Sequence, residues 1–168
     1  PCVPEVMEPV PFPYDYPQML GGGPEDSTGI LGDYCLFFYQ GGQEIFAGIQ
    51  HKAMSSIPAP FFSFRLTEGG SWNVSFFRNL LGHDGFCIHH DSCEPVIPRI
   101  YDYFYLNDVG RPVRLARIAG YPERMDLDGG GERELISRTS PDSFYFHRDG
   151  AVFRVDLKEA LGGYWPEN

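Results

Sequence analysis

The chain has 168 residues, a formal net charge of −10, and 14 Phe, 10 Tyr, 20 Gly and 15 Pro. This length fits one ordinary domain that buries most of its apolar surface without needing disulfides or metals for stability. No two Lys or Arg residues are adjacent, whereas a surface that tracks phosphates needs clustered cations. We therefore expect neither nucleic acid nor an anionic membrane as a partner. No apolar stretch approaches the roughly 18 residues of a membrane span.

Residues 1–28 are rich in proline and end near Gly21-Gly22-Gly23-Pro24. Prolines this close together interrupt both helices and central strands. The sequence thus predicts an irregular N-terminal arm followed by a single β domain over residues 29–168. The chain begins at Pro1-Cys2, so we expect that an upstream export or anchor segment has been removed. Pro1 is an unusual residue to precede a lipid-bearing cysteine.

One pattern recurs four times after the arm. Each copy has an aromatic strand, a glycine-bearing turn and a second strand in which apolar and polar residues alternate. The copies are Leu36–Tyr39 with Glu44–Ala47, Phe61–Leu66 with Trp72–Phe76, Tyr101–Leu106 with Pro112–Leu115, and Phe144–His147 with Val152–Leu157. This pattern is the signal of β-hairpins. It predicts a mostly β fold, an antiparallel hairpin or meander sheet with little helix. A recurrence near 40 residues is also compatible with propeller-like blades.

Two short segments are candidates for helix. Ser75 to Leu81 has room for one or two turns, and Leu157 to Leu161 is followed by a Gly162-Gly163 stop.

The aromatic residues have two interpretations. Alternation places Tyr101, Tyr103 and Tyr105 on one face of their strand and Phe104 on the other. Together with Trp72, Phe144 and Phe146, these residues favour core or cross-strand packing, and a sugar- or peptide-binding platform is the alternative.

A second chemistry-bearing segment runs from His83 to Cys93 and holds three of the five His residues. If it forms a strand, Cys87 and His89 share one face and His90 points the other way. Its interpretations are a surface loop closed by a Cys87–Cys93 disulfide, a metal site, or a catalytic histidine. Cys2 would then pair with Cys35, and the alternative is four reduced thiols in a cytosolic protein.

The segment Asp126-Leu127-Asp128-Gly129-Gly130-Gly131-Glu132-Arg133-Glu134-Leu135 places carboxylates around three glycines. Ca²⁺ prefers six to eight oxygen ligands, and such a loop supplies them from alternate residues.

The same loop resembles the Asp-x-Asp-Gly-Asp-Gly-x-x-Glu-Leu loop of FG-GAP/VCBS-type repeats of secreted and surface β-propellers. The resemblance implies a Ca²⁺ site with Asp126 and Asp128 as side-chain ligands, the carbonyl of Glu132, and Glu134 as the closing carboxylate. Gly130 stands where the repeat has an acid, which weakens the site or leaves an ion-free turn.

These features lead to a non-enzymatic binding module with a protein or glycan partner, and the resemblance implies an exported bacterial surface protein or lipoprotein. The alternative is a secreted hydrolase that uses the His83–Asp91 segment, and a third interpretation is a purely structural module. No Gly-x-Ser-x-Gly elbow supports nucleophilic catalysis.

Overall fold

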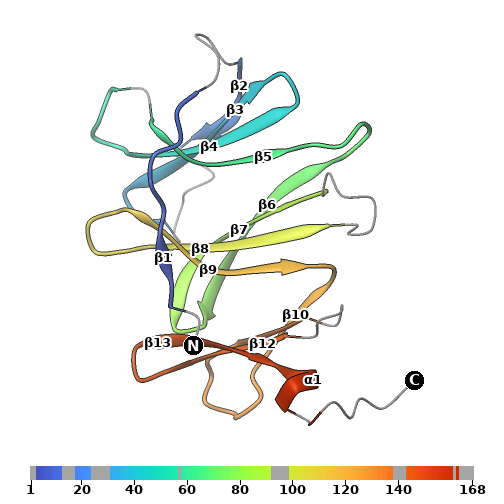
Figure 1. Ribbon diagram of the computed structural model, residues 1–168. Coiled ribbons are helices and arrows are strands. Elements are labelled where there is room, and N and C mark those ends of the chain that lie inside the picture. The colour runs from blue at the N-terminus through green and yellow to red at the C-terminus, as the bar shows by residue number, and fades with distance from the viewer. Residues whose placement is uncertain are drawn as a thin grey trace.

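The computed structural model describes residues 3–12, 18–23, 31–56, 58–91, 99–137, 143–160 and 162. The chain forms three antiparallel sheets, which lie one above another as three layers (Figure 1). The expectation of a mostly β fold built from hairpins is confirmed. Within the described ranges, no helix has both the length and the apolar character needed to cross a membrane.

Each sheet contains four strands that are consecutive in the chain. The first sheet has the order β2 (Gln18–Gly23), β3 (Tyr34–Gly41), β4 (Glu44–His51) and β5 (Pro60–Arg65). The middle sheet has the order β1 (Glu5–Val6), β9 (Pro112–Ala119), β8 (Ile100–Leu106), β7 (His83–His90) and β6 (Trp72–Leu80). The third sheet has the order β10 (Pro122–Met125), β11 (Glu134–Ser137), β12 (Ser143–Arg148) and β13 (Ala151–Asp156), which leads into α1 (Leu157–Ala160).

Three of the four expected hairpins form, and one does not. The pairs β3–β4, β8–β9 and β12–β13 are antiparallel neighbours. β5 and β6, expected to pair with each other, are edge strands of two different sheets. The glycine-bearing segment between them, residues 66–71, therefore links two layers instead of closing a hairpin.

The helix expected from Ser75 to Leu81 is wrong, because most of this segment belongs to β6. Trp72, Val74 and Phe76 face the first sheet, and Phe77 faces the third. A strand covered on both faces carries apolar residues on both, which imitates helical spacing. The second expected helix exists as α1.

Two hydrophobic cores hold the layers together. The first core lies between the first and middle sheets and includes Leu36, Phe38 and Phe104. The second core lies between the middle and third sheets and includes Tyr103 and Leu135. Tyr103 and Phe104 are thus on opposite faces of β8, as alternation predicted.

The N-terminal arm adds two strands to the sheets, so it is less irregular than its prolines suggested. β1 pairs with β9, and β2 pairs with β3. Between them Val10 donates its N–H to the carbonyl of Pro60 in β5 at 2.7 Å. Phe12 then packs edge-on against the rings of Tyr39 and Phe46, each 5.2 Å away. The arm therefore runs from the edge of the middle sheet to the outer face of the first.

Candidate functional site

The acidic loop joins β10 to β11 and is closed by its own hydrogen bonds. Three loop N–H groups donate to three loop carboxylates: Gly131 to Asp126 Oδ2 (3.0 Å), Gly130 to Asp128 Oδ1 (2.8 Å) and Leu127 to Glu134 Oε2 (2.8 Å). Gly129 and Gly131 have φ of 74° and 83°, which side-chain-bearing residues rarely adopt. The glycines are therefore required for the loop's shape with or without an ion.

The carboxylates of the acidic loop accept hydrogen bonds from the loop's own backbone. Among the residues that the structure describes, no three His, Cys, Asp or Glu side chains are grouped as metal ligands. One oxygen of each of Asp126, Asp128 and Glu134 accepts a loop N–H instead. The side chain of Glu132 leaves the loop and approaches a histidine. Calcium binding through these four residues stays a prediction.

The acidic loop docks on the turn between β6 and β7. Arg133 donates its N–H to the carbonyl of Asn79 at 2.9 Å, and Leu81 donates to the carbonyl of Arg133 at 2.9 Å. The side-chain amide of Asn79 also donates to the carbonyl of Gly131. Asn79 and Leu81 have φ of 47° and 51°, so the turn holds two non-glycine residues in the left-handed region. The docking places the acidic loop against the turn that leads into the His83–Cys93 segment.

A cluster of three polar side chains forms where the loop meets this turn. Glu132 accepts from Nδ1 of His147 in β12, with an Nδ1–Oε1 distance of 3.2 Å. The His147 ring is 5.9 Å from the ring of His83, the first residue of β7. A Cβ at Gly82 would lie 2.8 Å from His147 Nδ1, so only glycine leaves room for this contact. Glu132 was expected to offer only its backbone carbonyl to Ca²⁺, and His83 to belong to a separate His/Asp-rich segment, so their meeting through His147 was not predicted.

A hollow of about 510 Å³ opens beside this cluster, between the first and middle sheets. Gly82, His83 and Asp84 line one side of it, Tyr105 and Asn107 line another, and Tyr34 of β3 lines a third. The His83 and Tyr105 rings stack at 3.8 Å and 22°. Asp84 is held because its Oδ1 accepts the N–H of Asn79 at 2.9 Å. The hollow therefore has positioned aromatic and hydrogen-bonding walls.

The surroundings of His83 favour its neutral form. Burial lowers the pKa of His83, the nearby His147 lowers it further, and Glu132 opposes both effects. Burial raises the pKa of the stacked Tyr105 hydroxyl, with a smaller contribution from Asp108. At neutral pH both rings are uncharged, and each can donate and accept a hydrogen bond.

The remaining histidines of β7 lie away from the hollow. His89 stacks on Tyr101 at 5.3 Å, whereas His90 points to the other face and stacks on Phe64 at 4.3 Å. The opposite orientation of His89 and His90 is as predicted. His83 and His89 are six residues apart on one strand, which places them about 20 Å apart. The histidines of this segment therefore do not converge on one centre.

His90 has a buried partner that the sequence did not indicate. Its Nε2 is 3.3 Å from Oδ2 of Asp102 in β8, and Asp102 is fully buried. The other oxygen of Asp102 has no hydrogen-bond partner among the described residues, and the nearest cation is Arg117 at 3.9 Å. Asp102 lies next to Ile88 across the β7–β8 register, so this pair belongs to the interface between the first and middle sheets.

The cysteines give no support to a site at this strand. Cys87 is a buried thiol in the second core, where burial raises its pKa and disfavours the reactive thiolate. Cys35 is also buried. Cys2 and Cys93, the expected disulfide partners, lie outside the described residues, so both pairings stay predictions.

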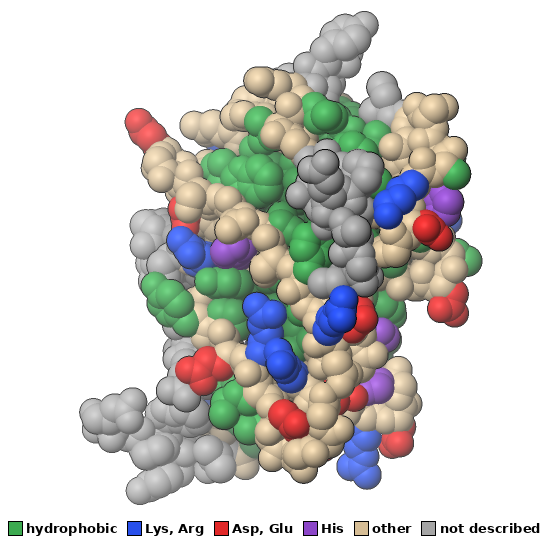
Figure 2. All heavy atoms as spheres, turned by 180° about the vertical axis from the view of Figure 1, so that it is seen from behind, with side chains coloured by type: hydrophobic (Ala, Val, Ile, Leu, Met, Phe, Trp, Pro, Cys, Tyr) green, Lys and Arg blue, Asp and Glu red, His purple; other side chains and the backbone are tan. Residues whose placement is uncertain are grey.

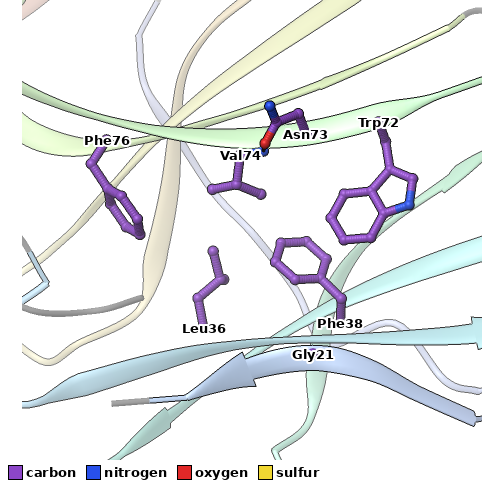
Figure 3. Close-up of a pocket in the computed structure, with 7 residues that line it drawn as sticks. All are labelled: Gly21, Leu36, Phe38, Trp72, Asn73, Val74 and Phe76. Atoms are coloured by element: carbon purple, nitrogen blue, oxygen red, sulfur yellow. Dashed lines mark hydrogen bonds between the residues drawn. The ribbon is translucent and has the colours of Figure 1, made fainter. Parts of the chain in front are cut away.

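A second, smaller hollow of about 210 Å³ lies between the edge strand β6 and strands β2 and β3. Figure 3 shows Trp72, Val74 and Phe76 directed toward Leu36 and Phe38 across it. These five side chains belong to the first core or pack against it. Asn73 is the one polar side chain among its described lining residues, and its Oδ1 accepts the N–H of Val74 at 2.7 Å, so we regard this hollow as an open end of the core.

Charged side chains do not form a single basic surface on the face seen in Figure 2, where Lys and Arg lie close to Asp and Glu.

Comparison with family models, curated proteins and solved structures finds no match. The resemblance to FG-GAP/VCBS-type repeats therefore stays a prediction that rests on the loop residues alone.

Proposed function

We propose that the chain is a non-enzymatic binding module of an exported bacterial surface protein, and that the hollow beside His83 is its ligand site. The observation that supports this most strongly is the stacked His83–Tyr105 pair, which lines a hollow of about 510 Å³. Ligand sites are commonly concave, of 300–1,000 Å³, with aromatic walls and a few placed polar groups. The hollow has each of these properties.

In this proposal the acidic loop has a structural role, which is to hold the β6–β7 turn in position. Its backbone bonds to Asn79 and Leu81 hold the β6–β7 turn, which carries His83 and Asp84 to the hollow. The layers of four consecutive strands are consistent with a blade-like arrangement, and the loop resembles a calcium loop that has lost one acid at Gly130. We include a weak calcium site at Asp126, Asp128, Glu132 and Glu134 in the proposal.

A hydrolase that uses the His83–Asp91 segment has less support. General acid and base groups must lie within hydrogen-bonding reach of the same substrate atoms. His83 and His89 are at opposite ends of β7, and His90 is buried on the other face. Asp84 is the sole carboxylate among the described residues that line the hollow. Binding therefore fits the geometry better than hydrolysis does.

The binding proposal predicts that fragments of different chemistry occupy the hollow. We would record ligand-observed NMR of a mixture of neutral, cationic, anionic and aromatic fragments with the protein. His83→Phe keeps a ring on Tyr105 but removes both nitrogens, and we expect it to weaken at least one hit by tenfold or more. His89→Phe is the matched control, because His89 also stacks on a tyrosine of β8 but does not line the hollow.

Two results would contradict the proposal. One is the absence of any fragment signal that saturates with protein concentration. The other is a set of hits that His83→Phe and His89→Phe affect equally, because those fragments would then bind elsewhere.

A further inference from the structure

We propose that the ligand of this hollow is a neutral carbohydrate. This inference rests on the proposed function and names the ligand class of the same site. It follows from three properties of the hollow: the kinds of hydrogen-bonding groups on its walls, the absence of cations among its described lining residues, and its size.

The walls combine groups that suit hydroxyls. A sugar hydroxyl both donates and accepts, and a neutral imidazole has one nitrogen of each kind. Asp84 uses Oδ1 to accept the N–H of Asn79, and its carboxylate is an acceptor for a ligand hydroxyl. Asn107 Oδ1 accepts from the N–H groups of Val109 and Arg111, which leaves its NH₂ group as a donor. The hollow thus offers an acceptor, a donor and a group that is both.

The charges near the hollow disfavour anionic ligands. The described residues that line it include no Lys or Arg. Lys52 donates to the carbonyl of Gly32 at 2.7 Å but does not itself line the hollow. The chain has a net charge of −10, and Asp84 contributes a negative charge at the wall. Phosphorylated or carboxylated ligands would therefore be repelled.

The apolar part of the walls suits the C–H face of a sugar ring. The ring of Tyr34 meets His51 edge-on at 5.2 Å, and its hydroxyl lies against Gly110, where a Cβ would come within 2.0 Å of it. Tyr34 is therefore held in place from two sides. Leu31 and Leu106 add apolar surface beside it. A volume of about 510 Å³ accommodates a ligand of one or two sugar rings rather than a small ion.

The test is isothermal titration calorimetry of the full chain with neutral mono- and disaccharides built from glucose, galactose, mannose and N-acetylglucosamine. We expect saturable binding of at least one of them. His83→Phe should weaken it tenfold or more, whereas His89→Phe should change it less than twofold. Asp84→Asn keeps an oxygen for the Asn79 N–H but removes the charge, and should weaken binding severalfold. Unfolding midpoints of all three variants establish that each is folded.

Glucosamine and a glucose phosphate are included as charged comparisons. The carbohydrate assignment is overturned if no neutral saccharide binds at 10 mM, or if only the charged comparisons bind. It is also overturned if binding is unchanged in both His83→Phe and Asp84→Asn. The fragment experiment separates this failure from failure of the proposed function. If fragments bind in a His83-dependent way but saccharides do not, the ligand class is wrong and the binding module stands. If neither binds, both proposals fail.

Discussion

His83 owes its properties to three residues from other parts of the chain. Tyr105 stacks on its ring, His147 approaches from β12, and Glu132 of the acidic loop holds His147. Burial and the nearby His147 lower the pKa of the imidazole and keep it uncharged at neutral pH against the opposing effect of Glu132, and the stack on Tyr105 orients it. A histidine in this state makes the site sensitive to mild acidification.

We predict that the protein loses stability as the pH falls from 7.5 to 5.5, partly through His83. Its pKa is lowered in the folded state, chiefly by burial and then by His147. The unfolded chain, with an ordinary histidine pKa of about 6.5, therefore takes up the proton first. The free energy of unfolding should be highest above that pH and fall below it.

The measurement is the thermal midpoint of wild type and His83→Phe at both pH values. On acidification the thermal midpoint of the variant should fall by less than that of the wild type. Some decrease should remain, because burial also lowers the pKa of His89. Equal losses in the two proteins would show that His83 does not carry the effect.

The sequence predicted part of this site because strand alternation is local. It named His83 as a candidate and placed Cys87 and His89 on one face of β7 and His90 on the other, away from the hollow, whereas Glu132 was expected only as a backbone ligand of Ca²⁺. It did not find His147, whose ring meets His83 from another sheet, or Asp102, because no pattern within β8 shows that its side chain meets His90 across the β7–β8 pair. No single-strand pattern shows that Gly82 leaves space for an imidazole from another sheet.

At the scale of elements, the β6–β7 turn is the most constrained segment near the site. Asn79, Leu81 and Gly82 all have positive φ, and the register of the two strands shifts between Phe77 and Leu80. The acidic loop hydrogen-bonds to this turn from another sheet. The turn therefore depends on long-range contacts for its shape.

A comparison of two glycines in this region distinguishes the energetic effect of backbone strain from that of a steric clash. Gly82 and Gly129 have nearly equal φ, 75° and 74°, but a Cβ at Gly82 would collide with His147 whereas one at Gly129 meets nothing within 4 Å. We predict that Gly129→Ala lowers the free energy of unfolding by about 1 kcal/mol and Gly82→Ala by about 2–4 kcal/mol. Urea unfolding measures both. Equal losses would mean that His147 moves aside without cost.

Calcium should stabilise the acidic loop only weakly. Extracellular calcium modules bind in the range of about 0.1–1 mM, and Gly130 removes one acid from the loop. We predict that 5 mM calcium raises the thermal midpoint by about 2–4 °C over the value in EDTA. Asp128→Ala should abolish the rise, and Asp149→Ala, in the β12–β13 turn, should preserve it. No rise in the wild type would show that the loop holds no ion.

The limits of element prediction are clearest at the link between β5 and β6. Two apolar runs around Gly69-Gly70 look like a hairpin, because a turn and an interlayer crossing use the same residues. The distinction depends on which sheet covers Phe76 and which covers Phe77, and that is a property of the assembled layers. The β3–β4, β8–β9 and β12–β13 hairpins were predictable because their partners are adjacent in sequence.

At the scale of the molecule, the middle sheet is covered on both faces, and each core joins it to one neighbour (Figure 1). Leu36 of the first core and Leu135 of the second are almost fully buried. We predict that Leu36→Ala and Leu135→Ala each lower the free energy of unfolding by about 2–5 kcal/mol. Each variant should still unfold in a single transition that includes all three sheets. Urea unfolding followed by circular dichroism and Trp fluorescence tests this. A separate early transition in Leu135→Ala would show that the third sheet unfolds alone.

The pairing of β1 with β9 bears on the order of events during synthesis. Glu5 and Val6 pair with Arg114 and Val113, and Glu5 forms an ion pair with Arg114 at 3.2 Å. At roughly 5–20 residues per second, a ribosome needs on the order of 5–20 s after making β1 to make its partner. During that interval the first sheet can form, whereas β1 must wait. The beginning of the chain is therefore among the last parts to reach its final place.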